Sequence, residues 1–116
     1  MPPTSLKTTW YYILLSLAES DRHGLAVARE VLVLSDGQVR LWPATLYGAL
    51  EDLVDRGWIE ELTDPRRRPQ ADDNERKRYY RITRPGRAAA ATETERLANL
   101  VRVARSRVKP RTGETS

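Results

Sequence analysis

Two short strand patterns that frame a long basic segment constrain the fold more than any other feature of the sequence. Trp58–Leu62 and Arg78–Ile82 are rich in residues that favour strands, and Tyr80 and Ile82 fall on one side of the second strand. Residues 63–77 lie between them and contain proline and many charges. A connection of this length is usually functional or without fixed structure. The pattern predicts a β-hairpin with a long tip.

The positive charge of the chain is concentrated around this hairpin. Residues 64–87 contain nine Lys or Arg and four Asp or Glu, a net charge of +5, whereas the other residues contain eleven and twelve, a net charge of −1. A basic excess confined to one stretch is expected of a surface that meets phosphate groups. A solvated loop would explain the same charge equally well. The order of the elements along the chain has to decide between a phosphate-binding surface and a solvated loop.

Three helical patterns precede the hairpin. Lys7–Glu19 is apolar on nearly every side, so it needs cover on more than one face, and a second subunit could supply part of that cover. Leu25–Ser35 is a second helix that stops at a Gly-containing turn. Gln38–Leu41 is predicted as a small strand or an extended connector. Pro43 then opens a third helix, because the N–H that proline lacks has no partner at the first helical position. This helix ends near Arg56.

A long helix is predicted after the hairpin, capped by Thr83 and continuing to Val108. Its apolar stripe extends past what a core of this size can cover, which favours a homodimer over a helix that folds back on its own domain. We expect residues 109–116 to be a disordered tail. The residues predicted at the dimer interface are Trp10, Ile13, Leu14, Leu97, Leu100, Val101, Ala104 and Val108.

This order of elements is that of a winged helix-turn-helix, a mainly α fold with a small β-hairpin. Residues 1–82 would form the DNA-binding domain and residues 83–108 a C-terminal dimerisation helix. The third helix can enter the major groove with its N-terminal residues against base edges, while arginines on the hairpin tip reach phosphates or the minor groove. The predicted DNA-binding residues are Arg40, Pro43, Ala44, Thr45, Tyr47, Gly48, Arg66, Arg67, Arg68 and Arg78.

These candidates differ in how specific their signal is. Thr45 and Gly48 lie on the exposed face of the third helix and are the first choice for base contacts. Tyr47 borders the buried stripe, so packing is at least as good an explanation as DNA contact. Arg40 could grip a phosphate or be a plain surface charge.

Other charged residues have structural alternatives. Arg78 and Arg81 could face phosphates, or could pair with Glu60 or Glu61 across the hairpin. His23, the single histidine, is interpreted as a structural turn residue rather than a metal ligand or a base.

Several segments, taken in order, resemble the PadR-like family of bacterial transcriptional regulators. They are Tyr12-Ile13-Leu14-Leu15-Ser16-Leu17, Arg22-His23-Gly24, Pro43-Ala44-Thr45-Leu46-Tyr47-Gly48-Ala49-Leu50, Leu53, Gly57-Trp58-Ile59, Arg78-Tyr79-Tyr80-Arg81-Ile82-Thr83 and Pro85-Gly86. The resemblance implies a winged-helix domain, dimerisation through a C-terminal helical part, and repressor function, which small aromatic or amphipathic ligands relieve in some members. One C-terminal helix suggests the short form of the family.

Trp42 and the long hairpin tip are departures from the family pattern. Members often have a small capping residue before the proline, so Trp42 suggests that packing anchors this helix start instead. The basic insert at residues 63–77 is long, which leaves its DNA contacts open.

The composition argues against other classes. Without cysteine there are no disulfides or thiolate ligands, and with one histidine and no Gly-rich phosphate loop or metal-ligand cluster we expect no enzyme, cofactor or metal site. No apolar run could span a bilayer and no signal peptide is evident, so we expect a cytoplasmic protein without a membrane partner. The rival function is a winged-helix protein-interaction module that does not bind DNA. An aromatic effector could bind near Trp10 and Tyr11 at the dimer interface.

Overall fold

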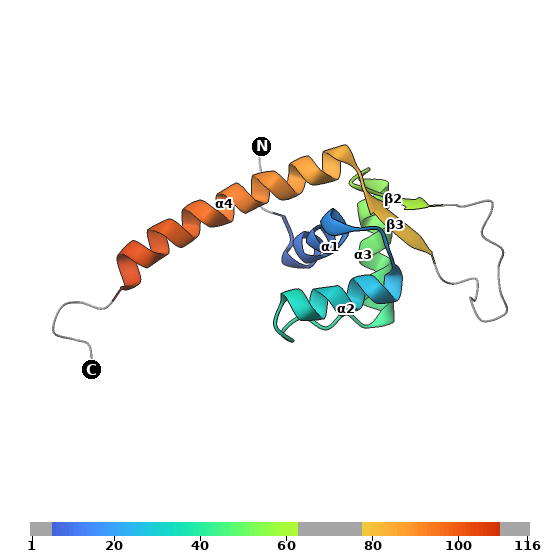
Figure 1. Cartoon of the computed structure of the whole chain (residues 1–116), viewed down its shortest axis with the longest axis horizontal. Coiled ribbons are helices and arrows are strands. Elements are labelled where there is room, and N and C mark those ends of the chain that lie inside the picture. The colour runs from blue at the N-terminus through green and yellow to red at the C-terminus, as the bar shows by residue number, and fades with distance from the viewer. Residues whose placement is uncertain (1–5, 63–77, 110–116) are drawn as a thin grey trace.

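The computed structural model describes residues 6–62 and 78–109. The elements follow one another in the order α1 (Thr8–Glu19), β1 (Arg22–His23), α2 (Gly24–Leu34), α3 (Pro43–Asp55), β2 (Ile59–Leu62), β3 (Tyr79–Ile82) and α4 (Arg84–Val108). Figure 1 shows α4 running along one side of a body formed by α1, α2, α3 and the small sheet, with its C-terminal half projecting beyond that body. The predicted mainly helical fold with a hairpin is confirmed.

The centre of the core is α1. Ile13, Leu14 and Leu17 are almost completely buried, and they pack with residues from every other helix and from the sheet. The apolar character of α1 on nearly every side is therefore explained within one chain, because α2, α3, α4 and β3 all contact it.

The C-terminal end of α1 is held by two arginines, the nearby Arg22 and the distant Arg87. Arg22 Nε donates to the carbonyl oxygen of Ser16 at 2.7 Å, and Arg87 Nη2 donates to the carbonyl oxygen of Ala18 at 3.0 Å. Cations at this end also complement the helix dipole. Arg87 thereby ties the start of α4 to the end of α1.

Helix α3 has the predicted start and a well-formed end. Pro43 occupies its first turn, and Gly57 follows it with φ +79°. Gly57 N–H donates to the carbonyl of Val54 at 2.9 Å and Trp58 N–H to that of Leu53 at 3.1 Å. This pair of hydrogen bonds is the Schellman motif, which turns the chain from α3 directly into β2.

The sheet has three antiparallel strands in the order β1-β3-β2, rather than the two that the sequence predicts. Ile59 pairs with Ile82 and Leu62 with Tyr79 across the hairpin, while Arg22 pairs with Tyr80 on the other edge. The sequence reads as a turn at Arg22–His23 because a two-residue strand has no periodicity of its own. Residues 38–41 form no strand, so the connector alternative is correct there.

The junction between the hairpin and α4 is tightly built. Thr83 caps α4 as predicted, since its Oγ1 accepts from Gly86 N–H at 3.1 Å, and the same hydroxyl donates to the carbonyl of Gly57 at 2.6 Å. Thr83 N–H donates to the carbonyl of Trp58 at 3.0 Å. These bonds fix the direction in which α4 leaves the sheet.

Three predictions fall on residues outside those described. They concern the hairpin tip at 63–77, its three arginines Arg66, Arg67 and Arg68, and the disordered tail, apart from residue 109. Among residues 6–62 and 78–109, none of the helices combines the length and the apolarity that crossing a membrane would require.

Candidate nucleic-acid interface

The N-terminal part of α3 presents a small and exposed face. Pro43, Ala44, Thr45 and Gly48 are all exposed, and a Cβ atom built on Gly48 would meet no described atom within 4 Å. The opposite side of the helix is buried through Leu46, Ala49, Leu50 and Leu53. Small side chains on the exposed face would let the α3 backbone approach a ligand closely.

The charge along α3 is strongly asymmetric. Its first turn contains no acidic residue, while Glu51, Asp52 and Asp55 are all exposed in its C-terminal half. The helix dipole places partial positive charge at the N-terminus, so both effects favour an anion at the start of α3 and disfavour one at its end.

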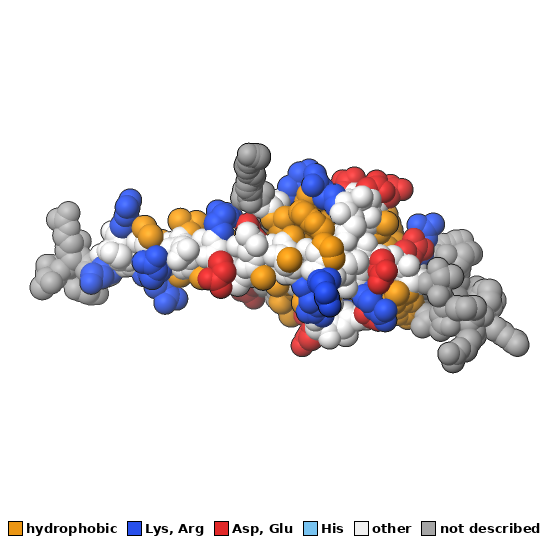
Figure 2. All heavy atoms as spheres, turned by 90° about the horizontal axis from the view of Figure 1, so that it is seen from above, with side chains coloured by type: hydrophobic (Ala, Val, Ile, Leu, Met, Phe, Trp, Pro, Cys, Tyr) orange, Lys and Arg blue, Asp and Glu red, His pale blue; other side chains and the backbone are white. Residues whose placement is uncertain are grey.

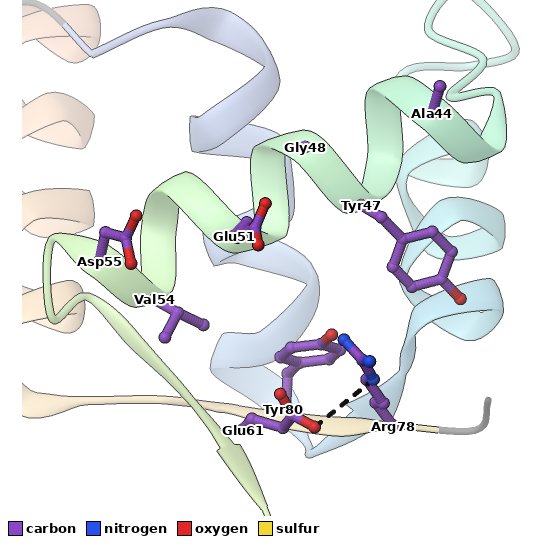
Figure 3. A pocket seen from close by; sticks show the side chains of 9 residues that line it. All are labelled: Ala44, Tyr47, Gly48, Glu51, Val54, Asp55, Glu61, Arg78 and Tyr80. Carbon is purple, nitrogen blue, oxygen red and sulfur yellow. Dashed lines mark ion pairs between the residues drawn. The ribbon is translucent and has the colours of Figure 1, made fainter. Parts of the chain in front are cut away.

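A groove of about 520 Å³ separates the exposed side of α3 from the hairpin. Figure 3 shows α3 above and the strands below, with Tyr47 from α3 and Arg78 from the hairpin extending into the space between them. The lining residues are Ala44, Tyr47, Gly48, Glu51, Val54, Asp55, Glu61, Arg78 and Tyr80. The lining has three carboxylates and one guanidinium, that of Arg78. The part of the groove beside the C-terminal half of α3 is therefore unsuitable for phosphate.

Arg78 lines the groove directly before the first residue of β3. Its side chain is 58% exposed, and its Nε lies 3.7 Å from a carboxylate oxygen of Glu61, as drawn in Figure 3. The hydrogen bond with the Tyr80 hydroxyl, and then the charge of Glu61, raise the pKa of Arg78, while burial and Glu61 raise the pKa of Tyr80. The pairing of Arg78 with Glu61 is one of the predicted alternatives, and exposed pairs of this kind contribute little to stability.

Tyr47 is a packing residue in this structure. A Cβ atom on Gly24 would lie only 2.6 Å from the Tyr47 hydroxyl oxygen, so the phenol lies directly on the start of α2. Gly24 is buried and Tyr47 is half-buried. The sequence leaves two interpretations of Tyr47 open, packing and DNA contact. The structure shows the packing contact, with Gly24 of the same chain.

Trp42 does not anchor the start of α3 by packing, contrary to the sequence-based expectation. Its side chain is 65% exposed, and within the described residues α3 has no side-chain cap. It contacts Arg40, whose guanidinium carbon lies 5.5 Å from the Trp42 ring centroid. Pro43, with its fixed φ, favours the helix start. The exposed aromatic beside the predicted DNA-binding residues is the feature that sequence reasoning missed, and the departure from a small capping residue was its only signal.

Two further sequence alternatives are resolved on the other edge of the sheet. Arg81 lies opposite Glu60 in the hairpin register and is influenced by its charge, but its guanidinium binds Asp21, with two hydrogen bonds of 3.3 and 3.0 Å. His23 has the structural role expected of it, because its Nδ1 accepts from Ala26 N–H at 3.3 Å and caps α2.

The predicted dimer interface divides into a buried part and an exposed part. Ile13 and Leu14 are 0% exposed inside the core of one chain and have no surface to offer a partner, which corrects that part of the prediction. On α4, Leu100, Val101 and Val108 are 54%, 46% and 76% exposed. Figure 2 shows apolar side chains among basic ones along the projecting half of α4. Leu97 is half-buried and Ala104 exposed on the same stripe.

Trp10 and Tyr11, predicted to line an effector pocket, face different surroundings. Trp10 is 8% exposed; the Arg56 guanidinium carbon lies 4.7 Å and Lys7 Nζ 4.8 Å from its ring centroid. A recess of about 370 Å³ beside Trp10 is lined by Lys7, Asp52, Asp55 and Arg56, and its lining does not include Tyr11. The Tyr11 hydroxyl lies 2.7 Å from Thr94 Oγ1 on α4.

Helix α3 following α2, with a hairpin beside its exposed face, defines a winged helix-turn-helix domain. The comparison with known families narrows this class. Residues 13–92 match the transcriptional regulator PadR-like family, and the chain belongs to that family. This confirms both the resemblance found in the sequence and the expectation that the chain is a transcriptional regulator rather than an enzyme.

Solved structures show the same fold. A transcriptional regulator from Clostridium thermocellum is 25% identical, with a TM-score of 0.68 over 87% of this chain and 90% of that one. A PadR family regulator from Clostridium difficile is 18% identical, with a TM-score of 0.69 over 87% and 98%. Bordetella bronchiseptica BpsR is 18% identical, with a TM-score of 0.67 over 95% and 73%. At 18% identity the likeness is one of fold alone. No curated protein sequence matches the chain.

Proposed function

We propose that this regulator acts as a homodimeric repressor that binds a palindromic operator through the N-terminal face of α3. The observation that carries the proposal is the exposed, acid-free first turn of α3, with Gly48 open beside it. A helix that presents small residues and the positive end of its dipole is suited to the major groove, whose floor carries the base-edge pattern and whose walls carry phosphates.

The charges of the described surface support one orientation on the duplex. Thr45 and Gly48 would face base edges, and Arg40 and Arg78 would lie toward the phosphates on either side. Glu51 and Asp55 would point away from the backbone, because a carboxylate near phosphate costs electrostatic energy. Arg66, Arg67 and Arg68 of the hairpin tip would add contacts to phosphates or to the minor groove.

Dimerisation would use the exposed stripe on α4. Leu100, Val101 and Val108 are apolar side chains of this stripe that one chain leaves exposed. Two chains related by a two-fold axis would read half-sites about 34 Å apart, the length of one turn of the duplex. A single domain would bind weakly, so dimerisation and affinity are coupled.

Release by a small aromatic effector is the finer part of the proposal. The solved structure of BpsR concerns regulation of its DNA binding by 6-hydroxynicotinic acid. In the present chain the recess beside Trp10, bordered by cations and carboxylates, is the described site where such a molecule would perturb α1 and α3 together. Effector binding there should change tryptophan fluorescence and DNA affinity in parallel; aromatic acids that change neither would remove this part of the proposal.

The decisive experiment measures binding to a labelled duplex from upstream of the chain's own gene, over a series of salt concentrations, beside a scrambled duplex of equal length. Tighter binding to the native duplex with a steep salt slope supports a sequence-specific regulator. A random pool of duplexes, selected over several rounds, covers the case in which the operator lies elsewhere. Failure to enrich any sequence from that pool would contradict the proposal and favour a protein-interaction module.

A further inference from the structure

Trp42 is a large aromatic side chain that the proposed function leaves without a role. Of the three tryptophans, all within the described residues, Trp10 is 8% exposed and Trp58 half-buried, whereas Trp42 is 65% exposed. Tryptophan is enriched where proteins meet their ligands, because it offers a large rigid apolar surface at low entropic cost. An exposed indole directly beside a candidate binding face therefore points to a contact.

The backbone holds Trp42 in a fixed position relative to that face. Trp42 is the N-cap residue of α3 and has an extended conformation, with φ −77° and ψ 157°. Its carbonyl accepts from Leu46 N–H at 2.8 Å, and Pro43 restricts the backbone of Trp42, the residue that precedes it. Trp42 therefore stands directly before the exposed first turn of α3, within reach of a ligand that binds there.

Arg40 completes the site from two residues upstream. Its guanidinium lies over the Trp42 ring at 5.5 Å, which restricts both side chains before any ligand arrives. Arg40 is exposed, and arginine can donate to a phosphate while it lies against an aromatic ring. The pair thus combines a flat apolar ring, that of Trp42, with an anion-binding guanidinium, that of Arg40.

These features fit one apolar group of the DNA major groove. The base edges there present hydrogen-bond donors, hydrogen-bond acceptors and one apolar group, the C5 methyl of thymine. An indole has a single N–H donor, so it cannot recognise a pattern of donors and acceptors, but its ring can pack on the methyl group. We propose that Trp42 packs on a thymine methyl group at the edge of each half-site, with Arg40 on the neighbouring phosphate. This inference rests on the proposed DNA binding, and it assigns thymine specificity to a residue outside the helix proper.

The test compares thymine with uracil, which differ only in this methyl group. The full chain selects a tight duplex from a random pool, and the same duplex is then made with deoxyuridine in place of thymidine. Affinities of the wild type, Trp42→Ala and Trp42→Phe are measured on both duplexes. Val33→Ala serves as the matched control, because Val33 is 71% exposed at the C-terminal end of α2 and is not part of the proposed contact.

The expected result is a coupling between the indole and the methyl group. Burial of one methyl-sized group corresponds to about a fourfold change in affinity. The ratio of affinities for the thymine and uracil duplexes should therefore fall by about fourfold per contacted methyl in Trp42→Ala, fall less in Trp42→Phe, and stay unchanged in Val33→Ala. Melting temperatures of the free proteins check that the variants fold equally well.

A second measurement follows the indole itself. Iodide should quench wild-type tryptophan fluorescence in the free protein, and bound DNA should protect it; Trp42→Phe should show little of either effect. An unchanged thymine-to-uracil ratio in Trp42→Ala would overturn the proposal, and an equal loss on both duplexes would assign Trp42 to the sugar–phosphate backbone instead. If the wild type binds no duplex, the proposed function itself fails, which the binding curves distinguish from either of these results.

Discussion

A Cβ atom on Gly86 would overlap the carbonyl oxygen of Trp58. The first turn of α4 can therefore lie against the turn that connects α3 to the hairpin only because residue 86 has no side chain. The same carbonyl accepts from Thr83 N–H at 3.0 Å. One peptide group thus sets both the direction of α4 and its distance from the winged domain.

Replacement of Gly86 by alanine should destabilise the protein by about 1–3 kcal/mol or more, the usual cost of forcing extra atoms into a packed site. The higher helix propensity of alanine, worth about 1 kcal/mol, acts in the opposite direction and is outweighed, since a backbone carbonyl cannot turn aside as a side chain can. Denaturant unfolding monitored by circular dichroism measures the difference. A variant as stable as the wild type would show that the α4 junction is looser than described.

Gly48→Ala should have the opposite effect on stability. A Cβ on Gly48 meets no described atom within 4 Å, and glycine inside a helix costs about 0.5–1 kcal/mol relative to alanine. The free protein should therefore be more stable by that amount, while affinity for the selected duplex should fall if this face approaches base edges closely. Greater stability with unchanged affinity would place the DNA contact elsewhere on α3.

Glu93 should make part of the stability depend on pH. Two hydrogen bonds from Arg96, at 3.0 and 2.6 Å, lower the pKa of Glu93, and the N–H of Leu6 at 3.4 Å adds to this effect against the opposing influence of burial. A carboxyl whose folded-state pKa lies below its unfolded value stabilises the fold above about pH 4.3, and this contribution is lost as the pH falls through the folded-state pKa.

Thermal unfolding between pH 3 and pH 7 tests this contribution. Glu93→Gln should lower the melting temperature near neutral pH and should lose less of it on acidification than the wild type. Glu95→Gln, an exposed neighbour on α4, serves as the control and should follow the wild-type curve. Parallel curves for Glu93→Gln and the wild type would show that this ion pair does not couple to folding.

Leu100→Asp should produce monomers. Leu100 is 54% exposed in one chain, and an aspartate there would bury an unpaired charge in the proposed interface. Ser106→Asp adds the same charge about half a helical turn away from the apolar stripe and should leave the dimer intact. Light scattering reports the mass, and DNA binding should weaken with the dimer. A dimeric Leu100→Asp protein would exclude this stripe as the interface.

Replacement of Arg66, Arg67 and Arg68 by alanine should weaken binding to all duplexes and reduce the salt slope. Each lost phosphate contact lowers the slope of log affinity against log salt by about 0.9, so the three together remove up to about 2.7. Lysine at the same three positions keeps the charge and should keep most of the slope. An alanine variant with the wild-type slope would mean that the hairpin tip does not contact the DNA backbone.

Most of the candidate interface follows from local sequence signals. Pro43 as the first residue of a helix, Gly57 at its end and small residues between them predict an exposed α3 face, which the structure places as expected. The sequence predicts packing for Trp42 because the family often has a small capping residue at this position, yet its side chain is 65% exposed. That exposure follows from how the whole chain packs, which no pattern near residue 42 encodes.

The order of the four helices and the hairpin, the Pro43 start of α3, the Thr83 cap of α4 and the asymmetry of charge along α3 all follow from the sequence, because each depends on residues within a few positions of one another. The folded arrangement alone shows that Arg81 binds Asp21, that Tyr47 packs on Gly24, that Ile13 and Leu14 belong to the chain's own core, and that a two-residue strand joins the sheet edge. These contacts join residues distant in sequence. Their geometry exists only after the helices have packed and the sheet has closed, so a local pattern carries no record of it.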